Sequence, residues 1–181
     1  EKIRKRKKYR KITNFIFNEN SVLTFQLSNG EYAVTCCVKI YQYRGSCNYW
    51  LVPITLKSIT KPTINEIIES EILGRTIGSG FSREQTQASQ PGIEKIWNYV
   101  GGKPNFRFGF AIQAVEHKDL LNFKNRFEKI GELDIVEGLK EIGSIGGEDS
   151  FERYDETYSN LDNQIKVFGY QKYPIRIIIN E

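Results

Sequence analysis

The sequence predicts an α+β fold: a curved antiparallel β-sheet with an SH3-like meander at its start and two or three packed helices. Apolar residues alternate with a period of two in three successive runs between residues 22 and 56, and turn signals separate the runs. Later segments carry apolar residues at helical spacing. We expect residues 21–181 to form one domain, preceded by a basic segment at residues 1–20.

The first hairpin turn of the predicted meander is Asn29-Gly30. Asn-Gly is the strongest short hairpin signal, because a type I′ turn requires a positive φ at both central residues. A two-residue turn there places three apolar pairs on one face of the sheet. The predicted pairs are Leu27 with Tyr32, Phe25 with Val34, and Leu23 with Cys36.

The second hairpin turn is predicted as a three-residue loop at Arg44, Gly45 and Ser46. It gives four further apolar pairs: Ile40 with Trp50, Val38 with Val52, Cys36 with Ile54, and Val34 with Leu56. A slip of one residue would spoil both hairpins, so the two turn signals support each other. The sequence therefore predicts one core face and one outward face, which carries Cys37, Tyr41, Tyr43, Cys47, Tyr49 and Leu51.

The first predicted helix begins at Thr63 and ends at Gly74. Thr63 and Glu66 match the S/T-x-x-E capping box, and glycine is a common C-terminal stop. Residues 74–90 are rich in Gly, Ser and Gln and are interpreted as a long loop. A second helix is predicted at residues 91–100, with Pro in its first turn and Gly after its end.

The second half of the chain is predicted to mix strands and helices. Residues 106–115 alternate as a strand, and residues 116–130 have the pattern of an amphipathic helix. Residues 133–142 are ambiguous between strand and helix. We expect the acidic, glycine-containing stretch that follows to be an exposed connection, and two closing strands at residues 164–168 and 175–179.

Charge is distributed unevenly along the chain, although the net charge of the 181 residues is only +4. Residues 1–11 carry eight Lys or Arg and one Glu, whereas residues 131–162 carry ten Asp or Glu and two basic residues. The basic balance of the whole chain therefore says little about the folded body. No apolar run approaches the roughly 20 residues of a membrane span, so none is expected.

The chain has three cysteines and no C-x-x-C motif. The predicted register directs Cys36 into the core and Cys37 and Cys47 outward. The two outward thiols would lie roughly 20 Å apart along the strands, too far for a disulfide. Free thiols favour a reducing compartment, so we expect a cytoplasmic protein.

His117 is the only histidine, so a Ser-His-Asp or Cys-His catalytic site would have to use it. It lies at the polar start of a predicted helix, where an exposed histidine is common. No Cys/His spacing indicates a zinc site. The glycine-rich residues 74–80 follow a helix and lack the Gly-Lys-Ser/Thr ending of a phosphate-binding loop. We therefore expect no cofactor and no catalytic site.

The basic N-terminal run offers a candidate nucleic-acid surface, because Lys and Arg neutralise phosphates. Its candidate contacts are Lys5, Arg6, Lys7, Lys8 and Arg10. The same run could also lie on an anionic membrane, be a solvated tail, or be one face of a truncated helix.

The outward face of the meander carries an unusual group of tyrosines. Tyr41, Tyr43 and Tyr49 lie on this face, and the predicted register places Tyr41 opposite Tyr49. Aromatic cross-strand pairs stabilise a sheet, and a helix could also cover these rings as a second core. The functional interpretation is a protein-binding patch, since Tyr supplies contact area at low entropic cost.

A second candidate surface is the acidic stretch, in which aromatic side chains are interleaved. Such a run is commonly a solvated face, and paired carboxylates are also typical of glycosidases. The sharper interpretation is a surface that docks a basic protein and blocks that partner's own nucleic-acid surface. Its candidate partner-binding residues are Glu148, Asp149, Glu152, Tyr154, Asp155 and Glu156.

Residues 21–33, SVLTFQLSNGEYA, contain a strand, a polar-Gly turn, an aromatic residue and a small residue, followed by a long second strand. This pattern resembles the opening of the immunity protein 26 family of bacterial polymorphic toxin systems, and the similarity extends to about residue 100. The resemblance implies a cytoplasmic, non-catalytic protein that binds and neutralises a cognate toxin. It brings no catalytic residues.

We therefore expect an immunity protein that occludes the active site of a toxin in bacterial competition. The alternative is a small nucleic-acid-associated β-barrel module that uses the basic run and whose affinity falls steeply with salt. An enzyme is the third hypothesis, and it would need a deep pocket holding His117 or two close carboxylates.

Overall fold

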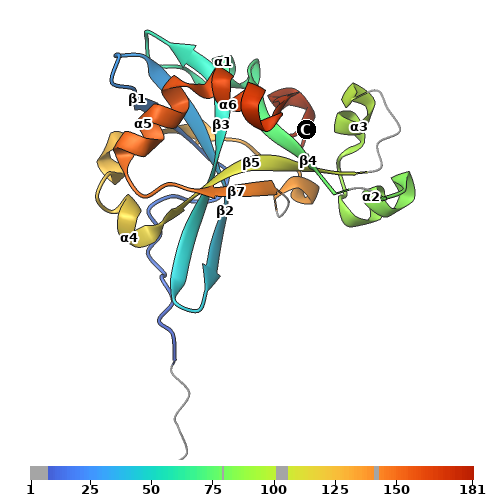
Figure 1. The fold of residues 1–181 in the computed structure, drawn as a ribbon, viewed down its shortest axis with the longest axis horizontal. Helices are drawn as coiled ribbons and strands as arrows, with labels where there is room; N and C mark the ends of the chain where they lie inside the picture. The colour runs from blue at the N-terminus through green and yellow to red at the C-terminus, as the bar shows by residue number, and fades with distance from the viewer. Residues whose placement is uncertain (1–7, 79, 101–105, 141–142) are drawn as a thin grey trace, which may run out of the picture.

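The computed structural model describes residues 8–78, 80–100, 106–140 and 143–181 (Figure 1). The strands are β1 (Ser21–Gln26), β2 (Tyr32–Tyr43), β3 (Ser46–Ser58), β4 (Glu71–Ile77), β5 (Arg107–Glu116), β6 (Glu128–Glu132), β7 (Gly143–Gly147) and β8 (Gln171–Pro174). The α-helices are α1 (Ile64–Ile68), α2 (Arg83–Ser89), α3 (Glu94–Val100), α4 (His117–Leu120), α5 (Phe151–Ser159) and α6 (Leu161–Phe168). Short 3₁₀ turns are η1 (Lys124–Arg126), η2 (Glu137–Leu139) and η3 (Ile175–Ile177).

The strands form one open, mixed sheet in the order β6-β1-β2-β3-β4-β5-β7, and β8 pairs with β4. Its pairs are antiparallel except β5 with β7, which is parallel. The predicted α+β class with a curved, mainly antiparallel sheet is confirmed. Over the described residues, the helices lack the length and apolar character that a bilayer crossing would require.

Side chains are buried on both faces of this sheet. The first core lies on the face that carries Val34, Cys36, Val52, Ile54, Phe108 and Phe110. The second core lies on the opposite face and is formed by Leu23, Phe25, Cys37, Tyr49, Leu51, Tyr154 and Tyr158. Helices α5 and α6 cover the second face in Figure 1, and Leu161 of α6 packs on the sheet beside this core.

Phe25 lies at the centre of the second core. Its ring centroid is 4.8 Å from that of Tyr158 and 5.2 Å from that of Tyr154, both near edge-to-face. Burying one such ring stabilises a fold by about 1.5–3 kcal/mol, and each aromatic pair adds about 0.5–1.5 kcal/mol. The two tyrosines are four residues apart on α5, so they share the helix face that contacts the sheet.

The first hairpin turn differs from the predicted one. Gly30 has a φ of +90°, and Asn29 does not have a positive φ. The N–H of Leu27 donates to the carbonyl of Glu31 at 2.7 Å, so the loop is a three-residue turn with a glycine bulge. The register is shifted by one residue, and the predicted pairing is wrong. The alternating apolar side chains of β1 therefore fill the second core.

The second hairpin turn has the type I′ geometry that was expected for the first. Arg44 and Gly45 have φ values of +48° and +85°, and the turn contains only these two residues. A bulge at Val38 then shifts the register again. The predicted pairs are therefore wrong by one or two positions, and the observed ones are Ile40 with Tyr49, Cys36 with Val52, and Val34 with Ile54.

The helix predicted at residues 63–74 begins as expected but has only five residues, as α1. Its N-cap is Thr63, whose hydroxyl accepts a backbone N–H at 3.3 Å. The predicted stop, Gly74, lies instead in β4, where an added Cβ would be 2.0 Å from the Tyr173 ring. Residues 74–90 are also not one long loop, since they contain the end of β4 and helix α2.

Among the later elements, α3 and β5 confirm the helix predicted at residues 91–100 and the strand predicted at 106–115. The long helix predicted at residues 116–130 is wrong, because the segment contains only α4 and η1 before β6 pairs with β1. Residues 164–168 belong to α6 rather than to a strand, and residues 175–179 contain η3. The expected exposed connection contains β7, which extends the sheet.

All three cysteines are free and buried. The predicted outward position of Cys37 and Cys47 is wrong, because the second core covers that face. Burial raises the pKa of the Cys36 thiol to about 12 and also raises the pKa values of Cys37 and Cys47. These thiols are packing groups, since a buried neutral thiol is a poor nucleophile.

Candidate functional site

The hairpin of β2 and β3 extends well beyond the body of the protein (Figure 1). Between the Val38 bulge and the turn, Tyr41 and Tyr43 lie on the same face of this arm as Trp50. The Tyr41 ring stacks on Trp50 at 5.6 Å and on Tyr43 at 6.4 Å between centroids. Tyr41 is 41% exposed and Tyr43 is 55% exposed. The arm therefore presents a ladder of aromatic rings to the surroundings.

Cationic side chains lie over this aromatic ladder. The Lys39 ammonium is 5.5 Å from the Trp50 ring centroid and 5.9 Å from that of Tyr41. The Arg44 guanidinium lies 5.1 Å from the Tyr43 ring. Such contacts contribute about 0.5–1 kcal/mol each at exposed sites and hold the rings in fixed orientations.

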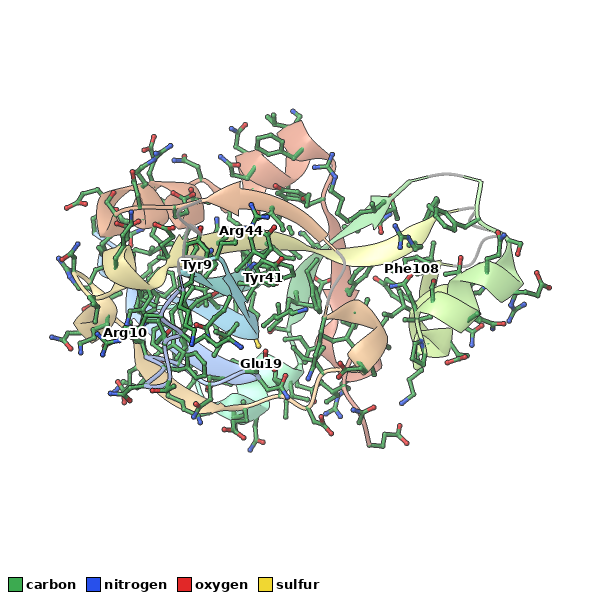
Figure 2. The ribbon with its side chains drawn as sticks, turned by 90° about the horizontal axis from the view of Figure 1, so that it is seen from below. Tyr9, Arg10, Glu19, Tyr41, Arg44 and Phe108 are labelled. Carbon is green, nitrogen blue, oxygen red and sulfur yellow. The ribbon has the colours of Figure 1, made fainter. Side chains whose placement is uncertain are left out.

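The N-terminal segment braces the opposite face of the arm. The Gln42 side-chain amide both accepts from Ile12 N–H at 2.9 Å and donates to the Ile12 carbonyl at 3.0 Å. Tyr9 packs against Gly45 at the turn. The Glu19 carboxylate accepts the Ile40 N–H at 3.0 Å, which satisfies a donor at the edge of β2. Figure 2 looks along the arm and labels Tyr9, Glu19, Tyr41 and Arg44 around it.

Two predicted partner-binding residues are core residues. Tyr49 is fully buried; it accepts the Ile16 N–H at 2.9 Å and lies 2.8 Å from His117 Nδ1. Tyr154 is also fully buried, and its hydroxyl donates to Thr35 Oγ1 at 3.2 Å. Burial raises the pKa of Tyr49 to about 12. The prediction of an outward Tyr49 opposite Tyr41 is wrong, and the second-core alternative holds for this ring.

The acidic residues occupy different environments at the start of α5. Glu148 is half-buried, accepts from Thr157 Oγ1 at 3.1 Å, and has a pKa raised by burial. Asp149 is exposed and lies 3.7 Å from Arg153. Asp155 accepts the Ser28 N–H at 2.8 Å, which ties α5 to the first hairpin loop. The remaining predicted acids, Glu152 and Glu156, are exposed.

An acidic hollow of about 350 Å³ connects this region to the arm. Asn48 is the register partner of both Tyr41 and Glu116, so these three residues form a row across β2, β3 and β5. Neighbouring strands are about 4.8 Å apart, so the backbones of Tyr41 and Glu116 lie about 10 Å apart. The hollow is lined by Asn48, Ala114, Glu116, Asp119, Gly147, Glu148, Asp149 and Arg153.

We call this combined area the aromatic–acidic surface; it consists of Tyr41, Tyr43, Asn48, Glu116, Asp119 and Asp149. It unites the exposed predicted tyrosines with Asp149 of the predicted acidic stretch. Glu116 and Asp119 were not predicted, because their position depends on the pairing of β5 with β3. Both residues were instead assigned to the start of the helix predicted at residues 116–130.

The predicted basic contacts are only partly within the described residues. Lys5, Arg6 and Lys7 lie outside them, whereas Lys8 and Arg10 are exposed. Arg10 lines a hollow with His117 on the side of the arm that the N-terminal segment covers. The segment that follows the basic run, from Ile12 to Ile16, is hydrogen-bonded to the body of the protein.

The enzyme hypothesis required a deep pocket that holds His117 or two close carboxylates. The His117 ring contacts Tyr49, by the 2.8 Å hydrogen bond and by stacking at 5.8 Å. A cavity of about 310 Å³ between the sheet and α6 contains one carboxylate, Glu148, among its described lining residues. In the described part of the chain, no three His, Cys, Asp or Glu side chains gather as metal ligands.

In comparisons with protein-family models, curated proteins and solved structures, nothing matches the chain.

Proposed function

We propose that this chain is a non-catalytic immunity protein, which binds a cognate bacterial toxin and occludes its active site. The observation that carries the proposal is the exposed ladder of Tyr41 and Tyr43 on a projecting, braced arm. Tyrosines that are already oriented lose little side-chain entropy on binding, and they are enriched among residues that dominate interface energies.

The neighbouring acidic hollow supports a basic partner surface. Glu116, Asp119 and Asp149 lie beside the arm, and carboxylates in such a position attract Lys and Arg across an interface. Charge complementarity raises the association rate and excludes partners with acidic surfaces. A toxin that acts on nucleic acid needs a basic active-site surface, so the aromatic–acidic surface is suited to cover it.

The resemblance of residues 21–33 to the immunity protein 26 family agrees with this proposal. In the cytoplasm of a producing cell, such a protein would need tight binding and no chemistry. The only histidine is hydrogen-bonded to a core tyrosine, which agrees with a binding role.

The test is co-expression of the full chain with the protein encoded by the neighbouring gene. We expect a stable complex on size-exclusion chromatography and relief of that protein's toxicity. Absence of both a complex and protection would refute the proposal.

A pair of variants tests whether the toxin docks on the arm. Tyr41→Ala with Tyr43→Ala removes the aromatic ladder, and we expect at least a tenfold loss of affinity by calorimetry. Tyr99→Ala is the matched control, because Tyr99 is 54% exposed on α3, which lies at the right of Figure 1, away from the arm. Equal losses in both variants would argue against docking through the arm.

A further inference from the structure

A second hollow, of about 560 Å³, lies between the N-terminal segment and α4. It is lined by Arg10, Lys11, Ile12, Thr13, Asn14, Phe15, Ile16, His117, Leu121 and Lys124. Three of these side chains are cationic, one is an imidazole, and none of the described lining residues is acidic. The proposed toxin-binding surface uses none of them.

The backbone that carries Arg10 and Lys11 is held on the body. Gln42 clamps Ile12 through two hydrogen bonds of 2.9 and 3.0 Å, and the Ile16 N–H donates to the Tyr49 hydroxyl at 2.9 Å. These cationic groups are therefore fixed opposite Lys124 rather than carried on a free tail. Positive groups that converge on one hollow raise the local concentration of anions.

The hydrogen bond with Tyr49 fixes the orientation of the His117 ring. The Tyr49 oxygen accepts the Ile16 N–H at 2.9 Å and lies 2.8 Å from His117 Nδ1. The Nδ1 edge of the imidazole therefore faces the phenol, and Nε2 lies on the opposite side of the ring. His117 thus lines the hollow in a ring position held by a buried phenol.

The hollow also has apolar walls that no core side chain covers. Phe15 is 38% exposed and Leu121 is 48% exposed, and both line it. A ring beside several cations is the arrangement in which proteins stack an unpaired base while they neutralise the backbone. In the sequence, residues 2–8 carry six more Lys or Arg.

We propose that this basic hollow binds single-stranded nucleic acid. Arg10, Lys11 and Lys124 contact phosphate oxygens, and Phe15 stacks on a base. A single strand fits better than a duplex, because the ring needs an unstacked base. This site lies apart from the aromatic–acidic surface, so its test is independent of the toxin.

The experiment is fluorescence anisotropy of a labelled short oligothymidylate titrated with the full chain, from about 50 mM to about 200 mM salt. Arg10→Ala with Lys124→Ala should weaken binding at least tenfold and lower the salt slope by about 0.7 for each lost phosphate contact. Phe15→Ala should weaken binding about fivefold or more at every salt concentration. Thermal melts should show that these exposed positions leave folding unchanged.

The matched control is Lys166→Ala with Lys172→Ala, which removes the same charge from α6 and β8. We expect its affinity to remain within twofold of the wild type. Three results would each overturn the proposal: no binding at the lowest salt, an equal loss in the control variant, or displacement of the oligonucleotide by polyglutamate of equal charge. The last result would identify an acidic protein segment as the partner.

Discussion

Four buried phenols determine much of the chemistry of this protein at the residue scale. Tyr49, Tyr154, Tyr158 and Tyr173 lie within the two cores, and burial raises the pKa of each phenol. Each hydroxyl has a hydrogen-bond partner, so the neutral form is satisfied in the folded state. The ionised form would be unsolvated there, which makes the fold sensitive to alkaline pH.

We predict that the free energy of unfolding falls above pH 10. A phenol with a raised pKa holds its proton more tightly in the folded than in the unfolded chain. Its stabilising contribution is therefore complete below the ordinary pKa of 10.0 and, for Tyr49, is lost as the pH rises through 10 to about 12. Urea unfolding across this range, followed with tyrosinate absorbance, tests this. Tyr49→Phe should flatten the pH dependence, and an unchanged profile would contradict the assignment.

Strand β7 shows how glycine allows an element to join the sheet. At Gly143, an added Cβ would lie 2.5 Å from the Phe110 carbonyl and 2.4 Å from the Ile112 side chain. At Gly146, in the same strand, it would meet nothing within 4 Å. The close approach of β7 to β5 therefore depends on the first glycine and not on the second.

Substituting these two glycines gives a matched pair of variants. We predict that Gly143→Ala destabilises the protein by about 1–3 kcal/mol, because the backbone carbonyl cannot move aside as a side chain could. Gly146→Ala should change stability by less than about 0.5 kcal/mol. Urea denaturation midpoints measure both. Similar midpoints for the two variants would mean that β7 does not pack as closely on β5 as the structure has it.

The N-terminal segment belongs energetically to the second core at the scale of the whole molecule. Ile12, Ile16 and Phe17 are half-buried against this core. The Phe17 ring lies 5.8 Å from Tyr49 and 5.6 Å from Phe127, in edge-to-face contact. The basic residues at the start of the chain and the apolar residues after them therefore have different roles.

Two truncations separate these roles. We predict that removal of residues 1–17 destabilises the protein by about 3 kcal/mol, because three apolar side chains leave the core. Removal of residues 1–8 should leave the unfolding midpoint unchanged, since the described contacts begin at Tyr9. Urea unfolding of both truncated chains tests this. Equal midpoints would show that residues 9–17 contribute no stability.

Local sequence patterns predicted correctly those elements that tertiary contacts do not override. The Thr63 cap, α3 and β5 were predicted, because capping chemistry and the apolar period fix each of them locally. The segment at β6 was predicted as a helix from the spacing of Leu120, Phe123 and Phe127. Its pairing with the distant β1 overrides that spacing.

The site was predictable only where side-chain type alone decided the outcome. Tyr41 and Tyr43 were predicted, but the turn between β2 and β3 has two residues where three were predicted. This difference of one residue pairs Tyr49 with Ile40 and directs the Tyr49 ring to the other face. The burial of Tyr154 depends on α5 crossing the second face of the sheet, where it meets Thr35, 119 positions away. Tyr49 is covered by Phe17 of the N-terminal segment and by His117 of α4. Long-range packing of this kind is absent from any local pattern.

The bulge at Val38 divides β2 into two parts with different freedom to change over evolutionary time. Before it, side chains on both faces are buried, so most substitutions cost stability. After it, Tyr41 and Tyr43 are exposed and belong to neither core. Mutations can accumulate there without loss of folding, so an arm of this kind can acquire new recognition while the body is inherited unchanged.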